Sequence, residues 1–221
     1  MIFGSVYALQ YNSFHVIPFI VLYFFILLNQ LLEFILKKRF DEEKFSNIVV
    51  FLIAEIALIA TLTYFWIYYS WLATLFLVLY SIFIQSNVLF RIYELRFLPA
   101  ILTLVMNLIF MNGFSCYTQA HFISIHALLI VTPQILPFFI LTIHQWRVKL
   151  SRILLVIILL FNMGLFIYSY YSIIGYWSFI ILLSLPFILP ILKNQTSEAK
   201  ALYAFVFGFL GIICLAIRLF I

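Results

Sequence analysis

Long runs of apolar residues, broken only by short charged or polar segments, most constrain how this chain folds. The lipid core of a membrane offers no water to peptide groups, so only helices or closed barrels cross it, and runs of roughly 20 apolar residues indicate helices. We therefore expect an all-α fold, a polytopic transmembrane bundle of about eight full spans that forms one domain over residues 1–221. The runs are residues 15–36, 48–66, 68–90, 97–113, 121–143, 150–170, 172–193 and 201–221.

The composition excludes a soluble fold. Apolar residues make up 67% of the chain and charged residues 9%, whereas an ordinary soluble domain carries roughly 25% charged residues. Ahead of the first full span, the apolar stretch from Met1 to Leu9 is too short to cross a bilayer alone. We expect it to form a partial helix, a re-entrant piece or a shortened first helix.

The basic residues predict an orientation in the membrane. They follow the first, third, fifth and seventh full spans, whereas the connections near Tyr68, Ser115–Ala120 and Tyr171 carry no charge. Of the 12 Lys and Arg residues, only Arg218 falls on the opposite side. Because cytoplasmic loops carry an excess of Lys and Arg, we expect a multi-pass protein of the cell membrane with these loops cytoplasmic. The basic residues form no continuous stripe, so nucleic acid is not an expected partner.

Three segments of the chain carry a resemblance to a known family. Their order and spacing resemble the UbiA superfamily of membrane prenyltransferases, which has nine helices, an NxxxDxxxD motif, a tyrosine–serine segment and a second aspartate motif. The resemblance covers nearly the whole chain and implies a membrane cavity for an isoprenoid or similar lipid. The segments are residues 4–9 (GSVYAL) with 29–33 (NQLLE) and Asp41, then Tyr80 and Ser81 ahead of Arg91 and Arg96, and a span ending at His144.

The carboxylates of that family are mostly replaced in this chain. In the family, the aspartate motifs hold Mg²⁺ against the diphosphate of the isoprenoid donor, because a hard cation neutralises the leaving group. Here Asn29 and Glu33 match the first two motif positions, but Lys37 occupies the third. The region of the second motif offers Arg147 and Lys149 and no carboxylate. We therefore expect no metal site, and Mg²⁺ would be a cofactor only if the family mechanism were retained.

A row of polar residues marks the end of the first full span. Asn29, Glu33, Lys37 and Asp41 recur at every fourth residue, so a continuous helix would carry them on one face. An ionisable group within an apolar run usually faces a cavity or a partner, which makes Glu33 the candidate catalytic residue. The alternative is an ion pair between Glu33 and Lys37 that anchors the helix end.

A second set of residues is expected to bind substrate. Their basic members would hold a phosphate or diphosphate directly, without a metal. The alternative is that these basic residues follow the positive-inside rule and contact anionic lipid headgroups. The candidate substrate-binding residues are Asn29, Lys37, Tyr80, Arg91, Arg96, Arg147 and Lys149.

The remaining polar residues of the apolar runs and their connections give weaker indications of function. Glu55 lies inside its apolar run, where it is either functional or a protonated carboxyl that hydrogen-bonds to a neighbouring helix. Cys116 is expected in an outward loop. His121 and His126 are five residues apart, about 140° round a helix, which argues against a cysteine peptidase or paired zinc ligands.

Two classes of function remain open. The resemblance implies a diverged UbiA-like protein that binds an isoprenoid or related lipid, with a membrane lipid or isoprenoid diphosphate as partner and prenyltransferase, a transferase, as its enzyme class if it is active. The competing class is a non-enzymatic membrane component, such as a transporter subunit, an export or immunity factor, or an accessory of a biosynthetic complex. A transporter more often shows paired intramembrane charges or repeated halves, and neither is clear here.

Overall fold

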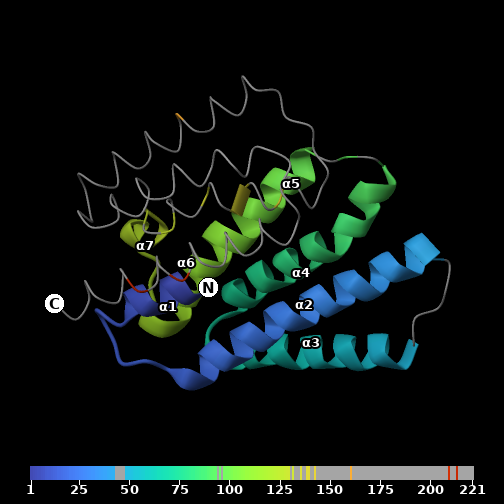
Figure 1. Cartoon of the computed structure of the whole chain (residues 1–221). Coiled ribbons are helices and arrows are strands. Elements are labelled where there is room, and N and C mark those ends of the chain that lie inside the picture. The colour runs from blue at the N-terminus through green and yellow to red at the C-terminus, as the bar shows by residue number, and fades with distance from the viewer. Residues whose placement is uncertain are drawn as a thin grey trace. The chain divides into compact units, whose positions relative to one another are not determined.

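The computed structural model describes residues 1–42, 48–93, 95 and 97–129, and isolated positions at 131, 135, 138, 139, 142, 160, 209 and 213. Every regular element within these residues is a helix (Figure 1). The described residues divide into two compact units. One unit contains Met1–Phe14 and the described residues from Ala100 onward, and the other contains His15–Pro99.

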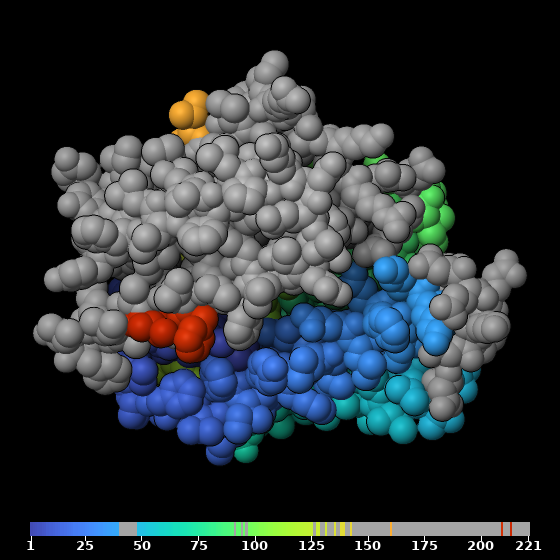
Figure 2. Space-filling model, viewed as in Figure 1, coloured from blue at the N-terminus to red at the C-terminus, as the bar shows by residue number. Residues whose placement is uncertain are grey.

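Three long helices form the unit His15–Pro99: α2 (Val16–Glu42), α3 (Ile48–Tyr68) and α4 (Trp71–Ile92). Each of the three packs against the other two (Figure 1). The helices are apolar on their buried and their exposed faces alike. Figure 2 shows the outer side chains of α2 and α3 in blue and cyan, and many of these are large and apolar. Helices that are apolar all round are typical of membrane spans.

Four helical segments have the length and composition of a membrane span. They are Val16–Arg39, Ile48–Tyr68, Trp71–Phe90 and Phe97–Ala120. They overlap the first four predicted runs, which confirms a helical architecture with segments able to cross a bilayer. The predicted runs from residue 121 onward lie outside the described residues, except for residues 121–129, which include α7 (Ile125–Leu129), and isolated positions.

The first span extends beyond its predicted end. The prediction ended it at residue 36, whereas α2 continues to Glu42. Lys, Arg and Glu are good helix formers, so a cluster of charges marks the edge of the apolar run without ending the helix. As a result, Asn29, Glu33, Lys37 and Asp41 all belong to one helix, as the row of polar residues requires.

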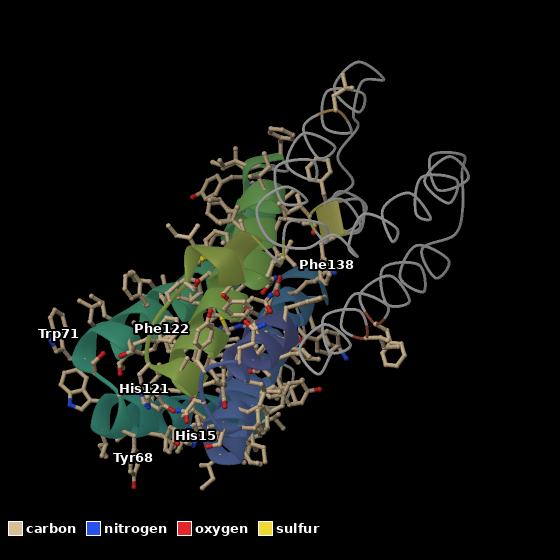
Figure 3. All side chains as sticks on the ribbon, turned by 90° about the vertical axis from the view of Figure 1, so that its left-hand side faces the viewer. His15, Tyr68, Trp71, His121, Phe122 and Phe138 are labelled. Atoms are coloured by element: carbon tan, nitrogen blue, oxygen red, sulfur yellow. The ribbon has the colours of Figure 1, made fainter. Side chains whose placement is uncertain are left out.

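Aromatic side chains gather where α3 ends and α4 begins. Tyr68 and Trp71 are 68% and 60% exposed, and both point away from the helices (Figure 3). Tyr64 contacts Phe65 and Tyr68 through its ring, with centroid distances of 5.3 and 4.9 Å. Aromatic rings at the ends of membrane helices are typical of the boundary between lipid and water.

In the other unit, the short helix α1 (Ile2–Ala8) packs against α6 (Met111–Ala120). The N-terminal stretch that was predicted as a partial helix, a re-entrant piece or a shortened first helix is therefore helical over seven residues. The backbone N–H of Gly4 donates to Asn112 Oδ1 at 3.2 Å, and the hydroxyls of Ser5 and Ser115 hydrogen-bond to each other. A Cβ atom on Gly4 would lie 1.8 Å from the carbonyl oxygen of Asn112, so only glycine permits this approach.

The prediction that Ser115–Ala120 forms an outward loop containing Cys116 is wrong. The fourth span consists of α5 (Phe97–Leu104), a π-helical segment η1 (Val105–Phe110) and α6, and Cys116 is buried in α6. Two polar side chains of α6, those of Asn112 and Thr118, are compatible with the helix because each donates to a carbonyl oxygen three or four residues earlier. Thr118 Oγ1, for example, donates to the carbonyl oxygen of Ser115 at 2.9 Å.

The predicted span from residue 121 also begins differently. His121 ends α6 in the left-handed conformation, with φ of 61°, and α7 starts at Ile125. His121 and His126 therefore do not lie on one continuous helix. The separation of about 140° holds only for a continuous helix, and here a helix end lies between the two histidines.

Candidate functional site

Buried and half-buried polar side chains link α2 to α4 within the unit His15–Pro99. Ser81 Oγ donates to Asn29 Oδ1 at 2.6 Å, and Gln85 Nε2 donates to Ser81 Oγ at 3.4 Å. One helical turn further along α2, Asn87 Nδ2 donates to Glu33 Oε1 at 3.4 Å. We call these five residues, Asn29, Glu33, Ser81, Gln85 and Asn87, the polar track.

Asn29 anchors the track. Its side chain is fully buried, and its Nδ2 donates to the carbonyl oxygen of Phe25 at 2.9 Å while its Oδ1 accepts from Ser81. Tyr80, the neighbour of Ser81, is 1% exposed and packs against Phe25 with ring centroids 5.9 Å apart. The contact between Phe25 and Tyr80 therefore fixes the register at which Asn29 and Ser81 meet.

Asn87 leaves a polar atom unsatisfied. Its side chain is 2% exposed, and among the described residues none donates a hydrogen bond to its Oδ1. A buried acceptor without a donor costs roughly 1–3 kcal/mol. The neighbouring carboxylate of Glu33 is itself only an acceptor when ionised. This level of the track is therefore suited to a group that donates hydrogen bonds, such as a hydroxyl or an amine.

The track leads toward the basic end of α2. Lys37 follows Glu33 by one turn, about 6 Å along the helix axis, and its side chain is half-buried. Lys38 and Arg39 come next and are exposed. An ammonium group in this position can bind a phosphate oxygen as a point charge.

Five of the eight predicted site residues lie on the two packed helices α2 and α4. Asn29, Glu33 and Lys37 lie on α2, and Tyr80 lies on the adjacent α4. Arg91 lies in the last turn of α4, but only its backbone is described. The other three, Arg96, Arg147 and Lys149, lie outside the described residues.

Three members of the track were not among the predicted site residues. Ser81 was named only in the tyrosine–serine segment, and the other two were not singled out. Gln85 and Asn87 are amide side chains inside an apolar run, and their position was the signal that could have revealed them. A polar side chain in a membrane span is costly unless it finds a partner, so each such residue indicates a contact between helices. The identity of that partner depends on helix packing, which the local sequence does not specify.

The described residues offer no obvious metal centre. They contain no group of three or more His, Cys, Asp or Glu side chains close enough to hold a metal ion. Glu33 is the carboxylate of the track, and the other four members are three amides and a hydroxyl. These groups fit hydrogen bonding to a ligand better than tight coordination of a hard divalent cation, which prefers several carboxylates.

The described helices define a helical protein with segments able to cross a membrane. The polar track lies between two of these segments. Comparison with protein-family models, curated proteins and solved structures finds no match to this chain.

Proposed function

We propose that this chain is a multi-pass membrane protein with a diverged UbiA-like fold that binds an isoprenoid or related lipid by its phosphate groups. The observation that carries the proposal is the polar track between α2 and α4, which leads to Lys37 at the basic end of α2. Two segments that resemble the family, Asn29–Glu33 and Tyr80–Ser81, face each other across these helices. This pairing supports the resemblance.

The proposed roles follow from the chemistry of each group. Lys37 and Arg91 would bind phosphate oxygens at the cytoplasmic face, and Arg96, Arg147 and Lys149 would complete the clamp. Asn29 holds the helices in register, and Glu33 is the remaining carboxylate available for proton transfer. Asn87 Oδ1 would accept a hydrogen bond from the ligand or an ordered water.

The first experiment measures binding of farnesyl diphosphate to the purified protein in lipid nanodiscs, using Lys37→Gln and Lys38→Gln. Each substitution removes one positive charge, but only Lys37 lies in the row with Glu33. A loss of one charge-assisted contact of about 1.5–3 kcal/mol weakens binding roughly 10-fold to 150-fold in Lys37→Gln. Lys38→Gln should remain close to the unsubstituted protein.

Equal losses in the two variants would mean that only general attraction between basic residues and anionic ligands is involved, and the proposal would fail. Release of diphosphate, measured with and without Mg²⁺ in the presence of a prenyl acceptor, then tests turnover. Binding without release would favour the non-enzymatic alternative. Release that Glu33→Gln abolishes would favour a transferase.

A further inference from the structure

The polar track leaves one membrane-embedded carboxyl unexplained. Glu55 lies seven residues after the start of α3, about 10 Å along a helix that is about 31 Å long. Its side chain is half-buried. Among the residues that the structure describes, none forms a hydrogen bond or ion pair with Glu55. A carboxyl at this depth is costly, so its position calls for a partner.

The residues round Glu55 repeat with the spacing of a helix-packing seam. Starting at Ile48, steps of four, three, four, three and four residues reach Trp66, and Glu55 is the single polar member. This spacing keeps the residues on one stripe of a helix that packs against another in a left-handed crossing. We call this stripe the outer seam of α3, and its members are Ile48, Leu52, Glu55, Ile59, Leu62 and Trp66.

The outer seam is distinct from the surface that α3 already uses. The buried residues of α3 are Ala54, Leu58, Thr61 and Phe65, a stripe about 100° away round the helix. By contrast, Leu52, Ile59 and Trp66 of the outer seam are 53%, 60% and 61% exposed. Within the unit His15–Pro99, α3 therefore carries one occupied seam and one that is open.

We propose that the outer seam of α3 is a docking surface for a second copy of this chain, with Glu55 at its centre. In a two-fold dimer whose axis is normal to the membrane, the two α3 helices run parallel and identical residues meet at the same depth. A protonated carboxyl both donates and accepts a hydrogen bond, so Glu55 is complementary to its own counterpart. Polar pairs of this kind hold membrane helices together, since lipid competes poorly for them.

The choice of a second copy rests on this self-complementarity. A different partner helix would need its own donor or cation at the depth of Glu55, whereas the chain itself supplies a matching group at the matching depth. The single polar residue also fixes register, as a lone polar residue does in the seam of a coiled coil. The apolar members of the seam then pack in register without further specification.

The experiment measures energy transfer between donor-labelled and acceptor-labelled copies of the full chain in liposomes, across a range of protein-to-lipid ratios. The labels are carried on fused domains, so no residue of the seam is altered. Transfer should rise with copy density for the unsubstituted chain. Glu55→Leu should weaken association between about 3-fold and 30-fold, the range that interhelical polar contacts in membranes span. Glu55→Gln retains a donor and an acceptor and should keep most of the association.

A matched pair of apolar substitutions tests the seam. Ile59 and Ile53 are 60% and 61% exposed, but only Ile59 belongs to the outer seam. Ile59→Ala should weaken association and Ile53→Ala should not. The proposal is overturned if copies show no transfer beyond random proximity, which would leave a different partner as the occupant. It is also overturned if they associate but neither Glu55→Leu nor Ile59→Ala weakens the association.

Discussion

Asn29 shows how an amide can be held inside a membrane helix. One end of its side chain returns to the helix through the carbonyl oxygen of Phe25, and the other end accepts the hydroxyl of Ser81 from α4. Both partners are within 2.9 Å, and the residue is fully buried. Asn29 therefore contributes to the pairing of α2 with α4 at a fixed register, in addition to any contact with a ligand.

This arrangement predicts a measurable coupling between Asn29 and Ser81. Ser81→Ala should destabilise the protein by about 1–2 kcal/mol, because it leaves Asn29 Oδ1 buried without a donor. In the double variant with Asn29→Ala the two losses should not add, and the interaction energy should fall between about 0.6 and 1.7 kcal/mol. Unfolding by a denaturing detergent in mixed micelles measures these free energies. Purely additive losses would show that the two side chains do not depend on each other.

At the level of helices, the apolar runs were sufficient to predict the spans that the structure describes. Lipid requires such runs to be helical, and α2, α3 and α4 agree with the prediction in number and approximate position. The helix ends were harder to predict. Lys37 suggested an end to α2 and Ser115 suggested a loop, but neither residue opposes helical dihedral angles, so both helices continue.

The candidate site was only partly predictable for a related reason. The spacing of Asn29, Glu33 and Lys37 places them on one face of α2 by geometry alone. The partners of that face depend on how α2 and α4 align, which the buried contact between Phe25 and Tyr80 helps to set. No local pattern encodes that alignment, so Asn87 was missed although it hydrogen-bonds to Glu33.

The packing of α1 on α6 provides a test of close helix contact. Gly4→Ala would bring a Cβ atom to 1.8 Å from the carbonyl oxygen of Asn112, a backbone atom that cannot turn aside. We expect a loss of stability of about 1–3 kcal/mol, the usual cost of overpacking. The midpoint of thermal unfolding in detergent measures the change.

Gly113→Ala is the matched control for that substitution. Its added Cβ would lie 3.1 Å from Leu128 Cδ2, the end of a flexible side chain that can move by a few tenths of an ångström. Replacing glycine by alanine within a helix also contributes up to about 1 kcal/mol in helix propensity. Gly113→Ala should therefore be neutral or mildly stabilising. Equal destabilisation by both substitutions would contradict the close contact of Gly4 with Asn112.

For the whole molecule, the charge pattern makes a prediction that reaches beyond the described helices. Eleven of the 12 basic residues are expected on the cytoplasmic side, and α2 and α4 each end in a basic segment, whereas α3 ends in the uncharged stretch near Tyr69 and Ser70. Adjacent spans must alternate in direction across the bilayer. The connection after α2 should therefore lie inside the cell and the connection after α3 outside.

A reporter domain that is active only outside the cytoplasm tests this arrangement when it is fused after Glu42, Ser70 or Ile221. We expect no activity after Glu42 and activity after Ser70, because Lys and Arg in short loops hold the first connection inside. Activity after Ile221 is expected as well, since eight full spans return the chain to the side on which the first began. An inactive fusion after Ile221, with the other two as expected, would require an odd number of spans. Reversed results after Glu42 and Ser70 would place the basic clamp proposed for lipid phosphate on the outer face, where a cytoplasmic phosphate donor could not reach it.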